Sequence, residues 1–294
     1  MSKAFNLNVS AMRTRRPASR SWRDFTHHRL SVLGLLLLLA FYGAALFAPW
    51  VAPDDPYAMN LQSAFLLPGQ GGHLLGTDNF GRDLFSRLIY GSRISLVSGL
   101  VVVVIAAGLG SLLGLVAGYF RGWVDVLIMR LVEVFFAFPF LVLVVAVIAV
   151  LGTSIFNVVW VLGVVSWPIY ARLVRAQVLT LRQREFVEAA RASGASSGRI
   201  MFRYILPNSL TPIIVAATFG VPQAILALAA LGFLGLGVQP PTPEWGTMVN
   251  EGKNYLLQSP SLIVWPGIFI ALVVMSFNFV GDGLRQAFDP RMGR

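Results

Sequence analysis

Long stretches without a single charged residue constrain this chain more than any other feature of its sequence. Residues 32–48 read VLGLLLLLAFYGAALFA, and residues 96–117 read LVSGLVVVVIAAGLGSLLGLVA. Each run approaches or exceeds the roughly 18–20 apolar residues that an α-helix needs to cross a lipid bilayer. Only 12% of the residues are charged, against about 25% in an average soluble protein. The sequence therefore predicts an integral membrane protein rather than a soluble protein with buried helices.

Apolar runs separated by polar connections predict an all-α, polytopic membrane bundle with six transmembrane helices. The expected spans are 31–50, 93–119, 123–151, 155–178, 209–236 and 262–281. An arginine-rich arm (1–30) precedes the first span, and a basic tail (286–294) follows the last. The first run could be mistaken for a signal peptide. It is longer than a usual signal core and its amino-terminal arm is long, so we expect a retained span.

The distribution of basic residues predicts the orientation of the bundle. With six spans, 19 of the 23 Lys and Arg residues fall on the side of the termini. Short cytoplasmic segments of membrane proteins carry an excess of Lys and Arg. We therefore expect both termini and the polar segment 185–208 in the cytoplasm, and the connections 51–92 and 237–261 outside. This asymmetry also accounts for the net charge of +10 without a nucleic-acid partner.

The chain lacks the residue patterns of the common enzyme classes. Its only lysines are Lys3 and Lys253, and neither belongs to a P-loop that could cradle ATP phosphates. His27, His28 and His73 have no metal-ligand spacing with suitable partners, and there is no cysteine. The sequence predicts a protein without catalytic residues, without a metal site and without a cofactor of its own.

Charged residues within the expected spans are few and lie near their cytoplasmic ends, so a proton relay through the membrane is not expected. Arg130 and Glu133 are three residues apart and can pair on one helix face. A transport pathway would instead be lined by small, apolar and neutral polar groups. The polar candidates are Asn157, Ser166, Gln223 and Asn278. Four prolines within spans permit bends: Pro139, Pro168, Pro222 and Pro266.

The segment EFVEAARASGASSGRIMFRYILPN (185–208) interrupts the apolar runs. Its first part predicts a short helix across the membrane face, because Glu188 can pair with Arg184 or Arg191 at helical spacing. Gly194 suits the left-handed residue that ends a helix.

The second part of this segment predicts another short helix before the fifth span. Ser196 or Ser197 can cap its start, and Pro207 is expected to end it. Asn208 or Ser209 can then cap the fifth span.

The spacing within 185–208 also resembles a known signature. Glu188-Ala189-Ala190, then Gly194, then Tyr204-Ile205-Leu206-Pro207 is similar to the EAA motif of importer-type ABC transporter permeases, with Tyr204 in the place of an isoleucine. Three further segments resemble the dipeptide/oligopeptide/nickel permease group, in particular its C-type subunit. They are LLGTDNFGRDLFSRLIYGSRISL (74–96), GVQPPTPEWGTM (237–248) and LRQAFDPR (284–291). The resemblance covers nearly the whole chain and implies the importer-type ABC permease fold, with the permease core at 93–285.

The resemblance implies one half of a transmembrane pathway in an ATP-driven importer of short peptides. Nickel chelates, opines and oligosaccharides remain open as cargo. The implied partners are a homologous B-type permease subunit, two cytoplasmic ATPase subunits, an extracytoplasmic substrate-binding protein and membrane lipid. ATP and Mg would be bound by the ATPase subunits and not by this chain. The implied location is the bacterial cell (inner) membrane, which the chain would cross several times.

The resemblance also implies site residues, with a coupling helix at 186–199. The residues assigned to the ATPase contact are Glu185, Phe186, Glu188, Ala189, Ala190, Arg191, Gly194, Leu206 and Pro207. The residues assigned to the binding-protein contact are Asp78, Arg82, Asp83, Pro241, Glu244 and Trp245. Two other classes stay open from the residues alone: a nucleotide-independent channel or secondary transporter, and a membrane scaffold or assembly factor without transport.

Overall fold

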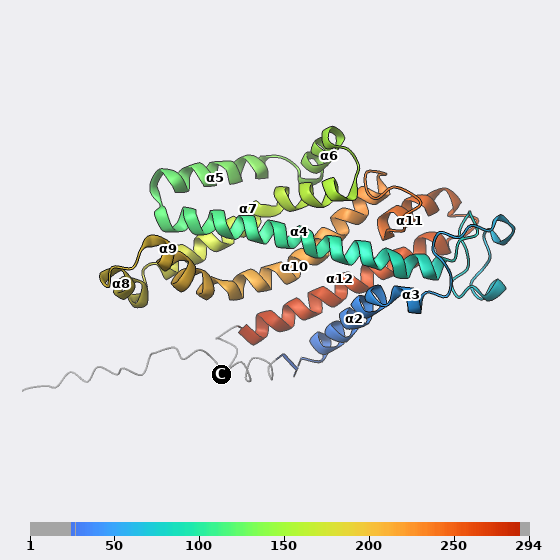
Figure 1. Cartoon of the computed structure of the whole chain (residues 1–294), viewed down its shortest axis with the longest axis horizontal. Helices are drawn as coiled ribbons and strands as arrows, with labels where there is room; N and C mark the ends of the chain where they lie inside the picture. Colours follow the sequence, from blue (N-terminus) through green and yellow to red (C-terminus); the bar gives the residue numbers. More distant parts are fainter. Residues whose placement is uncertain (1–24, 27, 289–294) are drawn as a thin grey trace, which may run out of the picture.

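The structure, a computed structural model, describes residues 25, 26 and 28–288 as a bundle of long helices (Figure 1). The expected features of the arm at 1–24 and 27, and of the tail at 289–294, lie outside the described residues. Within the described part, five helices are long and apolar enough to cross a membrane, or six if one bent pair is a single span. The predicted all-α membrane bundle is confirmed, and the described residues form no β-strand.

The elements are these, in chain order: α2 (Arg29–Leu46), α3 (Ala48–Val51), α4 (Leu84–Phe120), α5 (Gly122–Ala137), α6 (Phe140–Leu151), α7 (Ile155–Leu181), α8 (Glu185–Ala192), α9 (Ser197–Arg199), a π-helix (Ile200–Ile205), α10 (Leu206–Phe233), α11 (Trp245–Gly252) and α12 (Ser261–Phe288). Single 3-10 turns lie at Leu61–Ser63, Gln70–Gly72 and Lys253–Tyr255. Figure 1 shows α8 and α9 at one end of the bundle, and α3, α11 and the loop 52–83 at the other. These are named the α8 end and the α11 end.

A row of glycines lets α4 and α7 pack closely along the bundle. Gly110, Gly114 and Gly118 are spaced by four residues on the face of α4 that meets α7. A Cβ atom added at Gly114 would collide with the carbonyl oxygen of Ala171, and one at Gly110 with that of Trp167. Small residues at this spacing allow two membrane helices to approach at backbone distance. Close backbone packing at these glycines thus joins α4 and α7.

Replacing Gly114 by leucine is therefore expected to separate α4 from α7. Overpacking of this kind costs about 1–3 kcal/mol of folding free energy. The matched control is Gly108→Leu on the same helix, because an added Cβ there has no atom within 4 Å. Thermal unfolding of the purified chain in detergent should show a lower midpoint for Gly114→Leu only. Equal midpoints for the two variants would contradict this account of the packing.

The third expected span (123–151) is broken rather than continuous. Helices α5 and α6 meet at an angle of 92°. Phe138 is extended and Pro139 occupies the N-cap of α6. The residue before a proline is sterically driven away from the helical region, which explains why α5 stops here. By contrast, Pro168, Pro222 and Pro266 lie inside continuous helices.

The fifth span also differs from expectation, because a single helical segment runs over Ser197–Phe233. Pro207 does not end a separate helix, and neither Asn208 nor Ser209 caps the next one. The turn before the proline is a π-helix, in which Leu206 N–H bonds to Met201 O. Its wider hydrogen-bond register accommodates a residue without an N–H. The expected cap at Ser196 is confirmed: its hydroxyl accepts from Arg199 N.

The second span begins nine residues earlier than expected, at Leu84 instead of 93. Asp83 is its N-cap, and its carboxylate accepts a hydrogen bond from Ser86 N at 2.7 Å. The first turn of α4 carries Arg87 with its side chain only 1% exposed. The sequence placed Arg87 in the connection 51–92, but in the structure it is helical and its charge is paired with Glu251 and Asp78. The connection between α3 and α4 is therefore 52–83.

Candidate functional site

Helix α8 carries most of the residues assigned to the EAA-like segment, and its ends are well defined. Glu185 and Glu188 lie in its first turn and Arg191 in its last, an arrangement that complements the helix dipole. Gly194 adopts φ +77°. Ala195 N bonds to the carbonyl of Ala190 and Gly194 N to that of Arg191, which is the Schellman pattern that ends helices. The segment 186–199, which the resemblance assigns to the coupling helix, contains two helices, α8 and α9, and the predicted stop at Gly194 lies between them.

One face of α8 is anchored in the bundle. Val187 is fully buried and Ala190 nearly so. They belong to a small apolar cluster with residues of α4, α7, the π-helix and α10. Its other buried members are Leu115, Val174, Val178, Ile200, Met201, Ile205 and Ile213. Because several helices contribute to this cluster, α8 cannot shift without disturbing the ends of those helices.

The opposite face of α8 is exposed. It presents Glu185, Phe186, Glu188, Ala189 and Arg191, with the Phe186 ring 41% exposed. Among the described residues, Glu188 forms no ion pair with Arg184 or Arg191, although the spacing permits both. The expected Arg130–Glu133 pair does form, at 2.8 Å. An unpaired acid beside an exposed ring on an anchored helix is a surface suited to a partner.

Leu206 and Pro207, also assigned to the ATPase contact, lie at the start of α10 rather than on α8. Leu206 is half-buried and packs against the same apolar cluster, and Pro207 is exposed. The structure thus brings the first six assigned residues together on one helix, with Gly194 just beyond its end.

A cavity of about 640 Å³ lies between α4, α7, α10 and the α5–α6 junction. Its walls are mostly apolar and include Phe138, with Ser166 and Gln223 among the polar residues that line it. Ser166 donates to the carbonyl of Leu162 in its own helix. Of the four pathway candidates, two therefore face this cavity.

The other two pathway candidates lie elsewhere. Asn157 donates to the carbonyls of Leu151 and Gly152, where it closes the turn between α6 and α7. Asn278 is on α12, which does not line the cavity.

The α11 end contains a compact network of buried charges. Arg82 Nε lies 2.6 Å from Asp78 Oδ2, and Arg87 Nη2 lies 2.7 Å from Glu251 Oε2. Each arginine also contacts the other acid, Arg82 at 3.3 Å from Glu251 and Arg87 at 3.5 Å from Asp78. Both arginine side chains are 1% exposed. Two positive and two negative charges thus neutralise each other and fasten the loop before α4 to α11.

Glu244 is another buried acid at this end, and it caps the start of α11. Its carboxylate accepts hydrogen bonds from the N–H groups of Gly246 and Thr247, at 3.0 and 2.9 Å, and from the hydroxyl of Ser95 at 3.1 Å. Full burial raises the pKa of Glu244, while these hydrogen bonds oppose that shift. The neighbouring Trp245 ring is also buried, and its N–H donates to a carbonyl of α4.

These contacts correct the expectation for the binding-protein contact. Five of the six assigned residues have no surface to offer, because they are buried in the interior of the α11 end. They are Asp78, Arg82, Asp83, Glu244 and Trp245. Only Pro241 is exposed. Their polar side-chain groups instead have hydrogen-bond partners within the chain.

Sequence reasoning missed the partners that explain this burial. Glu251 lies more than 160 positions from Arg82 and Arg87 in the chain, so no local pattern connects them. Ser95 and Glu244, which are 149 positions apart, are likewise connected by no local pattern. The sequence offered only an indirect signal. Charged residues within or beside membrane spans are rare and are usually paired with an opposite charge.

Two family models match this chain. Residues 110–294 match the family described as "Binding-protein-dependent transport system inner membrane component". Residues 16–68 match the "N-terminal TM domain of oligopeptide transport permease C". The resemblance inferred from the EAA-like segment is confirmed.

Three relatives illustrate the similarity. The dipeptide transport system permease protein DppC of Alkalihalophilus pseudofirmus is 45% identical, over 94% of this chain and 90% of that protein. The di/tripeptide permease protein DppC of Pseudomonas aeruginosa is 47% identical, over 94% and 93%. The glutathione permease protein GsiD of Pectobacterium atrosepticum is 40% identical, over 95% and 92%.

A solved structure of the MetNI methionine ABC transporter in an inward-facing conformation shares the fold. Its matched chain aligns with a TM-score of 0.57 at 20% identity, over 70% of this chain and 98% of its own length.

Proposed function

This chain belongs to the family of inner-membrane components of binding-protein-dependent transport systems, and we propose that it forms half of an import pathway for short peptides, driven through α8. The family assignment rests on the match over 110–294 and on relatives more than 40% identical over most of the chain. The finer points, namely cargo, partners, orientation and the roles of single residues, are the substance of the proposal.

The observation that carries the coupling role is the way α8 is held. Its buried face, centred on Val187, packs on the ends of α4, α7 and α10, and its exposed face carries Glu188 and Phe186. A partner that pushes on the exposed face would therefore move several long helices together. Transmission between distant sites requires such an element, whose position both sites can bias. Cytoplasmic ATPase subunits, which would bind ATP and Mg, are the proposed partner, since this chain has no P-loop of its own.

The cavity beside Ser166 and Gln223 supports the pathway role. It is bounded by α4, α7 and α10, the helices whose ends carry α8. A second, homologous permease subunit would complete the pathway across this face. We place the α8 end in the cytoplasm, in agreement with the basic residues around 172–203, and the α11 end outside, where a substrate-binding protein would deliver cargo. The chain would sit in the bacterial inner membrane with both termini in the cytoplasm.

The cargo proposal rests on the relatives. Those at 40–47% identity are named for dipeptide, di/tripeptide and glutathione transport, and all of these substrates are short peptides. We therefore favour short peptides over nickel chelates, opines or oligosaccharides as the cargo of this chain.

Reconstitution in liposomes tests the function. The complex of this chain with its partner permease, ATPases and binding protein should take up a radiolabelled dipeptide only with ATP, and uptake should vanish when this chain is omitted. Excess unlabelled dipeptide should compete, whereas a nickel chelate or an oligosaccharide should not. Dipeptide uptake by the chain alone without nucleotide would favour a channel or secondary transporter and contradict the proposal.

A further inference from the structure

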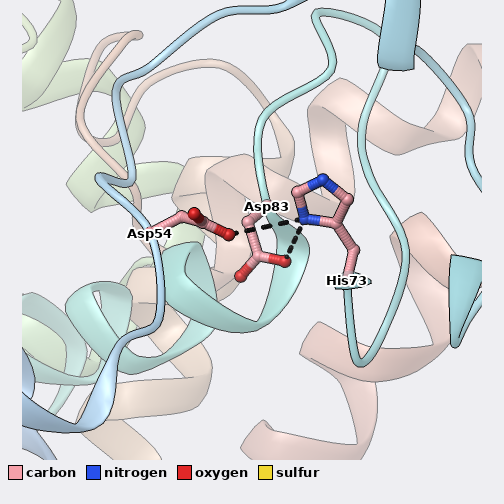
Figure 2. Close-up of side chains that lie close together, drawn as sticks. All are labelled: Asp54, His73 and Asp83. Atoms are coloured by element: carbon pink, nitrogen blue, oxygen red, sulfur yellow. Dashed lines mark hydrogen bonds and ion pairs between the residues drawn. The ribbon is translucent and has the colours of Figure 1, made fainter. Parts of the chain in front are cut away.

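Three side chains from separate parts of the α11 end converge on one point (Figure 2). Asp54 follows α3, His73 follows the 3-10 turn Gln70–Gly72, and Asp83 caps α4. His73 Nδ1 lies 2.9 Å from Asp83 Oδ1 and 3.5 Å from Asp54 Oδ2. One potential ligand atom from each residue lies within 4.8 Å of the other two. The loop 52–83 is thus folded back so that three chemically suitable groups face each other.

Ser86 holds the Asp83 carboxylate and the backbone at Asp54. Asp83 uses Oδ2 to accept from the backbone N–H of Ser86 at 2.7 Å, which leaves Oδ1 directed at His73. The hydroxyl of Ser86 accepts from Asp54 N at 3.1 Å and fixes the start of that loop. Outer hydrogen bonds that orient the ligands are a regular feature of metal sites in proteins. The cluster is therefore set by the fold rather than by chance contact of mobile surface groups.

The charge balance of the cluster is unusual for this end of the protein. The four charges of Asp78, Arg82, Arg87 and Glu251 neutralise each other, as described above. Within the described residues, Asp54 and Asp83 have no Arg or Lys partner, and both face the single Nδ1 of His73. The Asp83 side chain is 0% exposed. The cap on α4 satisfies Oδ2 of Asp83 through the Ser86 N–H. Its other oxygen and the Asp54 carboxylate share one neighbour, Nδ1 of His73, so a cation between them would supply positive charge to both acids.

We propose that Asp54, His73 and Asp83 form a binding site for a divalent cation of the zinc class. Zinc takes nitrogen and carboxylate ligands at about 2.0–2.2 Å, which places neighbouring ligands of a tetrahedron about 3.3 Å apart. The observed separations of 2.9 and 3.5 Å bracket that value. The cation replaces the proton on His73 Nδ1, and the proton leaves to solvent. Water occupies the fourth position, reached past the half-exposed Asp54.

The donor set also selects the kind of cation. An imidazole nitrogen suits zinc and neighbouring transition metals, whereas calcium and magnesium favour all-oxygen sites. The bound ion would clip the loop 52–83 to the start of α4. The sequence predicted no metal site, because Asp54, His73 and Asp83 are spread over 30 positions without motif spacing.

Metal binding is measured directly, without reference to transport. The full chain, prepared in detergent without a polyhistidine tag and stripped with a chelator, is dialysed against zinc and its metal content determined. We expect about one tightly bound zinc ion per chain, the occupancy of a single three-ligand site. No retained zinc would overturn the proposal.

Two variants separate a metal site from a plain hydrogen-bonded cluster. In His73→Asn the amide can still donate to Asp83, and Asp83→Asn preserves the helix cap because Asn caps as well as Asp. Each removes a metal ligand and should weaken zinc binding at least about 100-fold, the upper range for loss of an outer-shell partner. The matched control is Asp55→Asn, because Asp55 is an exposed neighbour outside the cluster. If His73→Asn and Asp83→Asn bound zinc as tightly as the unchanged chain, or if Asp55→Asn lost as much affinity as they did, the zinc would be bound elsewhere.

Discussion

Reversing the charge of Glu188 (Glu188→Arg) is expected to abolish ATP-driven uptake while the protein still reaches the membrane. Glu188 is exposed on α8 and forms no ion pair among the described residues, so the fold should tolerate the change. At the proposed ATPase interface the introduced guanidinium would face the basic or N–H groups that bind the carboxylate of Glu188. Losing a charged interface contact costs about 2–5 kcal/mol, which corresponds to roughly 30- to 4,000-fold weaker docking. Uptake in liposomes and co-purification with the ATPases measure both effects.

A charge reversal elsewhere at the same end provides the control. Asp282 is also exposed, near the end of α12, and lies outside α8. Asp282→Arg should retain uptake and co-purification, because the change in net charge is the same but the contact surface is untouched. Normal transport by Glu188→Arg would remove Glu188 from the interface. Equal loss in both variants would point to the general charge of this end rather than to α8.

Replacing Arg87 by methionine is expected to produce the largest loss of stability. Arg87 shares Glu251 and Asp78 with Arg82 in a buried network, and its removal leaves two acids facing one arginine. Breaking a buried pair by deleting one partner costs about 3–5 kcal/mol, because the remaining charge is uncompensated. Methionine retains much of the apolar volume, so the effect reports on charge. The midpoint of thermal unfolding in detergent should fall accordingly.

A second substitution tests this reasoning. In the double variant Arg87→Met with Glu251→Met, Arg82 and Asp78 remain as a neutral pair 2.6 Å apart. Part of the lost stability should therefore return, which a simple packing defect would not produce. Lys253→Met is the control for loss of one positive charge at the same end, because Lys253 is exposed. A double variant less stable than Arg87→Met, or a similar loss in Lys253→Met, would contradict the network.

Much of the helical architecture was predictable from the sequence. The first, second, fourth and sixth spans each correspond to one long helix, because a bilayer requires long uncharged segments and these are visible locally. The ends were less predictable. Helix α4 begins at Leu84, nine residues before the expected span, because polar residues of its first turns are neutralised by distant partners. The third span contained Pro139, but nothing local distinguished this proline, which breaks a helix, from Pro168, which does not.

The candidate site also has a part that local sequence predicts and a part that it does not. The residues of α8 and the stop at Gly194 could be placed from spacing, since caps and helix faces are local properties. The roles of Asp78, Arg82 and Glu244 could not, because exposure to a partner and burial in a network produce the same residue types in a sequence. The convergence of Asp54, His73 and Asp83 was likewise invisible, since loop closure alone brings them together.

The sequence by itself determined that this chain is a helical membrane protein, where most of its helices lie and which family it belongs to. These properties follow from runs of apolar residues and from motifs within about twenty positions of each other. Only the tertiary structure decided which polar groups are exposed to a partner and which are buried and paired within the chain. The physical reason is that a buried charge needs a counter-charge or hydrogen-bond donors supplied by the fold. Here the counter-charge of Arg87, Glu251, comes from a segment remote in the chain.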